Sequence, residues 1–150
     1  MLAIEAALDE VQMNTFKRVA AVALSALAVT VGSISASSAA NGVCGNGDFC
    51  LYKNTNYLGG VYDYSAVVTE NSYVGDQFYG AGTAVNNSAS SSVNKHSNYI
   101  VYAYESSFQG GDFIRHRPAG SGCVSGECPA YSSLGWINDT ISSHDAMWVP

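Results

Sequence analysis

A near-repeat about 51 to 52 residues long constrains the fold of this chain more than any other feature. Residues 52–60 (YKNTNYLGG) return as residues 104–111 (YESSFQGG), one residue shorter. Residues 86–91 (NNSASS) return in the same way as residues 138–143 (NDTISS). Because the two kinds of block alternate along the chain, the sequence predicts two similar structural units in tandem.

Residues 1–40 have the composition of an N-terminal extension and secretory signal. The basic pair Lys17-Arg18 precedes an uncharged, mostly apolar run over residues 19–31, and small residues follow. The apolar run is too short to span a bilayer comfortably. We therefore expect cleavage near Ala40 and a secreted, extracellular protein with no membrane contact after cleavage.

The start of this signal has an unusual feature. Three acidic residues (Glu5, Asp9 and Glu10) lie in front of the basic pair. Acidic residues are rare in the leading region of a secretory signal. We expect the true start at Met13. An amphipathic N-terminal helix on the mature protein is the alternative interpretation.

Residues 41–150 remain as the mature chain, long enough for a single domain with one core. They contain all ten tyrosines, fourteen glycines, four basic residues and nine acidic residues, which gives a net charge of −5. The small number of basic residues and the acidic balance argue against a nucleic-acid partner. The tyrosine and glycine content is typical of strands joined by turns.

All four cysteines lie in the mature chain, and an even number in an exported chain predicts disulfides. Three connectivities are possible. We favour the local pairs Cys44–Cys50 and Cys123–Cys128, because each encloses a short loop that contains glycine. A zinc site is the competing interpretation, and neither spacing is typical of zinc ligands.

Short β-forming segments recur at intervals of about ten residues in the mature chain, and none has a helical periodicity. The strongest strand pattern lies within residues 98–104. The sequence therefore predicts an all-β sandwich of two packed antiparallel sheets. We place its two halves, each a four-stranded Greek key, at about residues 43–97 and 98–150.

These patterns resemble the βγ-crystallin family. Tyr52 with Tyr57 and Gly59, and Tyr104 with Phe108 and Gly110, match the aromatic and glycine pattern of its Greek-key motif. The hexapeptides 86–91 and 138–143 match the calcium motif of its microbial members. The resemblance implies one or two Ca²⁺ sites shared between the halves, with ligands from Asn86, Asn87, Ser90, Asn138, Asp139 and Ser142.

Only one of these implied calcium ligands carries a charge. The first hexapeptide contains no carboxylate, and the second contributes Asp139. We therefore expect a modest affinity, around 10⁻⁴ M as in extracellular calcium modules. The alternative is that both hexapeptides are turns without a metal, in which Ser91 and Ser143 hydrogen-bond the folded hairpins.

The cysteine spacing resembles that of the Streptomyces metalloproteinase inhibitor family. The chain has C-x5-C near the mature N-terminus and C-x4-C later, and the later loop begins with Cys123-Val124. The resemblance implies a βγ-crystallin-like peptidase inhibitor and an extracellular protease as its partner. It also implies a rigid inhibitory loop at Ser121, Gly122, Cys123, Val124 and Ser125. A long surface loop held down only for stability is the alternative.

No catalytic constellation is present in the sequence. The histidines are isolated, and the motifs of serine hydrolases, zinc proteases and phosphate-binding loops are absent. We therefore expect a protein that is not an enzyme. Together with the family resemblance, this implies a monomeric inhibitor of extracellular zinc proteases. A calcium-binding crystallin module with a structural or stress role is the alternative, and a killer-toxin-like crystallin is a third class. We also expect four aromatic side chains to lie in hairpins and the core: Tyr52, Tyr57, Tyr104 and Trp136.

Overall fold

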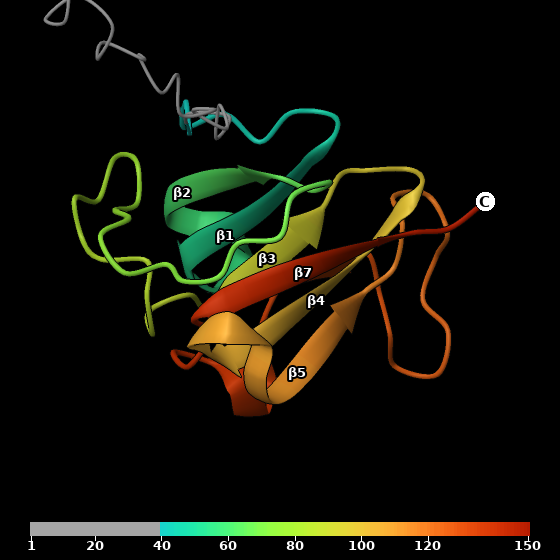
Figure 1. Cartoon of the computed structure of the whole chain (residues 1–150). Helices are drawn as coiled ribbons and strands as arrows, with labels where there is room; N and C mark the ends of the chain where they lie inside the picture. The colour runs from blue at the N-terminus through green and yellow to red at the C-terminus, as the bar shows by residue number, and fades with distance from the viewer. Residues whose placement is uncertain (1–39) are drawn as a thin grey trace, which may run out of the picture. The chain divides into compact units, whose positions relative to one another are not determined.

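The computed structural model describes residues 40–150, and the predicted signal sequence, apart from Ala40, lies outside them. Two antiparallel sheets form two layers (Figure 1). The first sheet, in the order β2-β1-β3-β6, contains β1 (Asp48–Asn54), β2 (Leu58–Ser65), β3 (Ser91–Asn94) and β6 (Ala130–Tyr131). The second, in the order β5-β4-β7, contains β4 (Tyr99–Ser106), β5 (Gly110–His116) and β7 (Ser143–Trp148). The 3₁₀ turns are η1 (Thr55–Tyr57), η2 (Ser107–Gln109) and η3 (Gly135–Ile137).

Each half of the chain contributes one segment to the sheet of the other half. β6 follows β5 in the chain but pairs with β3 of the first sheet, through Ala130 opposite Val93. In return, Glu70 forms an antiparallel bridge with His144 at the edge of β7. The all-β sandwich of two related halves is therefore confirmed. The fourth position of the second sheet is an isolated bridge rather than a strand.

Equivalent residues of the two halves lie 52 positions apart in the sequence. Ser91 Oγ donates to the carbonyl of Asn54, and the equivalent Ser143 Oγ donates to the carbonyl of Ser106, both at 2.6 Å. Each serine also accepts a backbone N–H from its hairpin. These are the hydrogen bonds that the turn interpretation expects of Ser91 and Ser143, and they leave the calcium interpretation open.

The structure corrects the alignment of the second hairpin. Its backbone makes Phe108 the equivalent of Asn56, since both have φ 57°, and makes Gln109 the equivalent of Tyr57. Tyr57 packs edge-on against Tyr52 with ring centroids 5.5 Å apart. Phe108 is instead 76% exposed. The repeat therefore contains no deletion, because the left-handed backbone positions, and not the aromatic residues, set the register of the two hairpins.

The core between the sheets combines apolar side chains with two buried histidines. Phe49 of β1 lies against His116 of β5 and His144 of β7, with ring centroids 4.9 and 5.2 Å apart. His116 Nε2 pairs with Ser92 Oγ at 2.6 Å, and His144 Nδ1 pairs with Tyr73 Oη at 2.9 Å. Burial lowers the pKa of His116 to about 3 and that of His144 to about 4. Both rings are therefore neutral core side chains at physiological pH.

The first disulfide joins Cys44 to Cys50, with a Cα–Cα distance of 5.9 Å, and ties the segment before β1 to the sheet. The second joins Cys123 to Cys128. Because residues 40–150 contain no free cysteine, the zinc interpretation of the cysteines is wrong. Within the same residues, no helix is long and apolar enough to cross a membrane.

Candidate functional site

The segment between β5 and β6 is a long loop whose two ends are held together. It is the orange loop that extends from the end of β5 in Figure 1. The backbone N–H of Arg117 donates to the carbonyl of Cys128 at 3.1 Å. The N–H of Asn94, at the end of β3, donates to the carbonyl of Pro129 at 2.8 Å. The loop therefore leaves and re-enters the sandwich at one point.

The end of this loop is a small β-hairpin. Val124 and Glu127 exchange both backbone hydrogen bonds, at 2.9 and 3.0 Å. The central residues Ser125 and Gly126 both have positive φ, 53° and 84°, as a type I′ turn requires. Cys123 and Cys128 form the next pair along the ladder and are disulfide-bonded, with a Cα–Cα distance of 4.2 Å. We call residues 123–128 the stapled hairpin.

The two edges of the stapled hairpin differ. In an antiparallel ladder, the pair next to a hydrogen-bonded pair directs its N–H and C=O groups outward. On one edge, the outward carbonyl of Cys128 accepts a hydrogen bond from the backbone N–H of Arg117. On the other edge, no hydrogen bond within residues 40–150 involves the backbone of Cys123. This edge can accept another polypeptide backbone.

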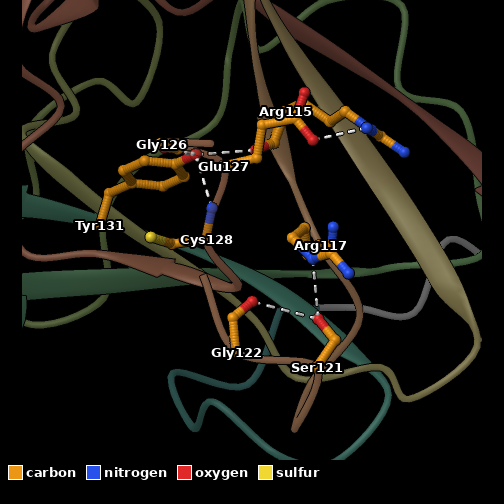
Figure 2. Close-up of polar contacts among 8 residues, drawn as sticks. All are labelled: Arg115, Arg117, Ser121, Gly122, Gly126, Glu127, Cys128 and Tyr131. Atoms are coloured by element: carbon orange, nitrogen blue, oxygen red, sulfur yellow. Dashed lines mark hydrogen bonds and ion pairs between the residues drawn. The ribbon is translucent and has the colours of Figure 1, made fainter. Parts of the chain in front are cut away.

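Tyr131 of β6 anchors the hairpin to the sandwich. Its phenol oxygen accepts the N–H of Cys128 at 2.9 Å and can donate its proton to the carbonyl of Arg115 (2.9 Å) or Gly126 (3.2 Å). Figure 2 shows the phenol beside the hairpin backbone. Burial raises the pKa of Tyr131, so the group stays protonated at neutral pH. The hairpin is therefore held by backbone contacts as well as by its disulfide.

An ion pair fixes the same side of the hairpin. Arg115 of β5 contacts the Glu127 carboxylate at 2.5 Å, and both side chains are about one-third exposed (30% and 36%). The Arg115 guanidinium also lies over the Tyr102 ring, 5.8 Å from its centroid. Further along the loop, Arg117 Nε donates to Ser121 Oγ at 3.3 Å, as Figure 2 also shows. These contacts hold the loop on both sides of the turn.

Removing the Tyr131 hydroxyl should loosen the hairpin. In Tyr131→Phe, the N–H of Cys128 loses its acceptor, so we expect the free energy of unfolding to fall by about 1–2 kcal/mol. We also expect faster hydrogen exchange at residues 123–128, measured by mass spectrometry. Tyr57→Phe is the control, because that phenol makes no hydrogen bond within residues 40–150. Equal exchange rates in the two variants would show that Tyr131 does not restrain the hairpin.

The predicted inhibitory residues all lie together at the exposed end of this loop: Ser121, Gly122, Cys123, Val124 and Ser125. Val124 is 50% exposed and is their only large apolar side chain. Sequence reasoning missed Tyr131 and the Arg115–Glu127 pair. It also missed the hairpin itself, although Ser125-Gly126 between two bonded cysteines is a recognisable two-residue turn.

The two predicted calcium hexapeptides meet in the structure. Asn87 Oδ1 accepts the Ser142 hydroxyl at 2.6 Å, and Asp139 Oδ1 lies 3.4 Å from the Ser90 hydroxyl. Asn87 and Asp139 both adopt left-handed backbones, φ 56° and 58°. Each pair takes one residue from each half of the chain, so the structure contains two equivalent clusters of oxygen atoms.

These clusters contain the kind of oxygen ligand that a hard cation binds, but few carboxylates. Carboxylate, amide and hydroxyl oxygens are the ligands that Ca²⁺ takes in proteins. Asn86 Oδ1 is buried without a hydrogen-bond partner, and Asn138 Nδ2 donates to Asp139 Oδ2 at 2.8 Å. Within residues 40–150, no group of three or more His, Cys, Asp or Glu side chains could hold a metal. Neutral oxygens would therefore supply most ligands at both clusters.

Solved structures show which fold class this geometry defines. A structure from a study of the evolution of the eye-lens βγ-crystallin domain fold is 23% identical, with a TM-score of 0.54, and the match covers 73% of this chain and 96% of that one. The N-terminal domain of Protein S is 18% identical (TM-score 0.49, 69% and 98% covered). A βγ-crystallin domain from Flavobacterium johnsoniae is 18% identical (TM-score 0.45, 67% and 93% covered). The first likeness supports a βγ-crystallin-like fold and nothing more specific.

The sequence shows the family to which the chain belongs. Residues 37–113 match the pattern of peptidase inhibitor family I36, and the chain belongs to that family. The predicted resemblance to the metalloproteinase inhibitor family is thereby confirmed. The matched stretch ends before the stapled hairpin, so the family assignment rests on the first half and β4–β5. No curated protein matches the chain.

Proposed function

We propose that the mature chain is a secreted inhibitor of extracellular zinc metallopeptidases, and that it inserts the stapled hairpin into the active-site cleft. The observation that carries this proposal is the restraint on an exposed apolar tip. Val124 is half exposed, while the disulfide, the type I′ turn and Tyr131 hold its backbone. Such preorganisation lowers the ordering entropy that binding costs. The two disulfides suit an oxidising, extracellular compartment.

The hairpin offers the groups that a zinc peptidase recognises. The unpaired carbonyl of Cys123 can approach the metal as a substrate carbonyl does, and the Val124 side chain then enters the apolar pocket after the scissile bond. The free edge at Cys123 can pair with a strand that lines the cleft. The zinc ion belongs to the peptidase, and the chain supplies a substrate-like backbone.

The same geometry explains why the hairpin would be a poor substrate. Hydrolysis of the Cys123–Val124 bond would leave Cys123 bonded to Cys128 through the disulfide. The new N-terminus at Val124 would remain paired with Glu127. Both product ends would therefore stay in the cleft, because neither can diffuse away from the hairpin.

Active-site titration tests the proposal directly. Oxidised residues 41–150 are added to a thermolysin-type zinc peptidase in saturating calcium, and the residual peptidase activity is measured. We expect a linear loss of activity that reaches zero at one inhibitor per active site. Full activity at micromolar inhibitor would overturn the proposal for this class of peptidase.

A calcium-binding role is the second candidate, because the two hexapeptides contact each other reciprocally. The Asn87–Ser142 and Asp139–Ser90 pairs lie at equivalent places in the two halves. A cation held there would link both halves and stabilise the fold through its preference for the native state. Only the cluster at Asp139 includes a carboxylate, so it should bind more tightly.

Calcium should raise the midpoint of thermal unfolding. With an affinity near 10⁻⁴ M, 10 mM calcium should stabilise the fold by about 3 kcal/mol, or on the order of 10 °C. Asp139→Ala should remove most of this shift, as followed by circular dichroism. Asp112→Ala, an exposed carboxylate on β5, should retain it. An unchanged midpoint at 10 mM calcium would contradict the calcium proposal. Both hexapeptides would then be turns that bind no metal.

A further inference from the structure

A shallow depression lies directly beside the stapled hairpin. Its volume is about 370 Å³, and its walls come from β5, from β6 to η3, and from the hairpin turn. Ser125 and Gly126 line it, together with Phe113, Tyr131, Leu134 and Trp136. Because the turn of the hairpin is one wall, a partner that covers Val124 lies next to the depression.

The depression presents apolar side chains to solvent. Trp136 is 65% exposed and Phe113 is 48% exposed, above the buried side chain of Leu134. The expectation that Trp136 is a core aromatic is therefore wrong. Exposed aromatic side chains that line the same depression on a small domain commonly mark a contact surface.

The charges around the depression indicate which chemistry would fill it. Its only charged lining residues are Arg115 and Glu127, and these pair with each other at 2.5 Å. The two charges offset each other and leave the surface nearly neutral, although Arg115 Nε has no hydrogen-bond partner within residues 40–150. An apolar side chain is a better occupant than a charged one, because a charge would lose hydration without gaining a partner.

The small size of the hairpin tip indicates that a partner would also need to contact the surface beside it. Residues 121–126 consist of serine, glycine, cysteine and a single valine. Stable protein–protein interfaces bury about 800 Å² on each partner and centre on a few large side chains, with tryptophan prominent among them. Val124 is the only sizeable apolar side chain at the tip. A tight complex therefore requires contacts with the surface that surrounds the tip.

We propose that the depression centred on Trp136 is a second contact surface for the same peptidase. It receives an apolar side chain from the rim of the active-site cleft while Val124 occupies the cleft itself. This inference rests on the proposed function and adds a determinant of affinity outside the reactive bond. Peptidases with a charged or recessed rim should then be inhibited more weakly.

The two tryptophans of the chain allow a matched test. Trp136→Ala should raise the inhibition constant for a thermolysin-type peptidase by roughly 10- to 100-fold, the effect of losing a central aromatic anchor. Trp148→Ala is the control, since Trp148 on β7 is similarly exposed (58%) but does not line the depression. It should change the constant less than about twofold.

A second measurement does not depend on how the alanine variant folds. The wild-type inhibitor is labelled with 5-fluorotryptophan, and its ¹⁹F spectrum is recorded with and without unlabelled peptidase. The Trp136 resonance should shift on complex formation, and the Trp148 resonance should stay in place. A complex in which neither resonance moves would overturn the inference.

The outcomes separate this inference from the function on which it rests. Unchanged inhibition in Trp136→Ala, together with lost inhibition in Val124→Asp, would overturn the second contact surface and leave the inhibitory hairpin intact. A wild-type protein that does not inhibit would overturn both. Weakened inhibition in both variants, with Trp148→Ala unaffected, would support both.

Discussion

Val124→Asp should weaken inhibition of a thermolysin-type peptidase by roughly 100-fold or more, because it places an unpaired carboxylate in an apolar pocket. The side chain is half exposed in the free protein and its backbone bonds to Glu127 are unaffected by the substitution. The free energy of unfolding should therefore change little. Inhibition constants and chemical denaturation curves measure the two quantities separately.

The control for this prediction is a valine of similar exposure elsewhere. Val67, in the turn after β2, is 47% exposed, against 50% for Val124. Val67→Asp adds the same charge to the whole molecule and should leave inhibition unchanged. Equal loss of inhibition in both variants would point to net charge rather than to the hairpin. Full inhibition by Val124→Asp would show that Val124 does not enter the cleft.

Acid should destabilise the fold strongly between about pH 6 and pH 4. His116 and His144 are fully buried, and desolvation is the largest cause that lowers their pKa values from 6.5 to about 3 and about 4. Each ring is neutral in the folded state and takes up a proton more readily when unfolded. The stabilising contribution is thus fully present above pH 6.5 and is lost as the pH falls.

The expected size is roughly 1 kcal/mol of unfolding free energy per pH unit for each histidine. Two such residues can remove much of a total stability of about 5–15 kcal/mol by pH 4. Denaturant unfolding at several pH values gives the slope. The slope of the unfolding free energy against pH reports the number of protons taken up on unfolding. His116→Gln and His144→Gln should each lower this number by about one, whatever the stability of the variant at neutral pH.

The slopes measured for the two core variants decide the acid prediction. A slope that is unchanged in both core variants would contradict the account, because carboxylates would then explain all of the acid dependence.

The sequence predicted the parts of the fold that short spacing or the internal repeat determines. The cysteine ring at 123–128 depends on near neighbours and is present. The hydrogen bonds of Ser91 and Ser143 to their hairpins each span 37 residues, and the repeated motif indicated them. The register of the second hairpin was displaced by one residue, because an aromatic match was preferred to the left-handed positions at Phe108 and Gln109.

Contacts between distant segments could not be predicted in the same way. β6 is two residues long and Glu70 forms a single bridge, so neither has a periodic pattern that would reveal the exchange between sheets. The anchoring of the hairpin by Tyr131 and Arg115 depends on that exchange. Trp136 gave no indication of its exposure, because an aromatic residue beside Ile137 is equally typical of a core.

Mutual exclusion at the zinc site tests the central claim most directly. A thermolysin-type peptidase is saturated with a small hydroxamate that occupies both the zinc ion and the apolar pocket after the scissile bond. Binding of residues 41–150 to this peptidase is then measured by surface plasmon resonance. We expect binding to be lost in the presence of the hydroxamate and to return when the hydroxamate is washed out. Binding of unchanged affinity to the blocked peptidase would contradict the insertion of the stapled hairpin into the cleft.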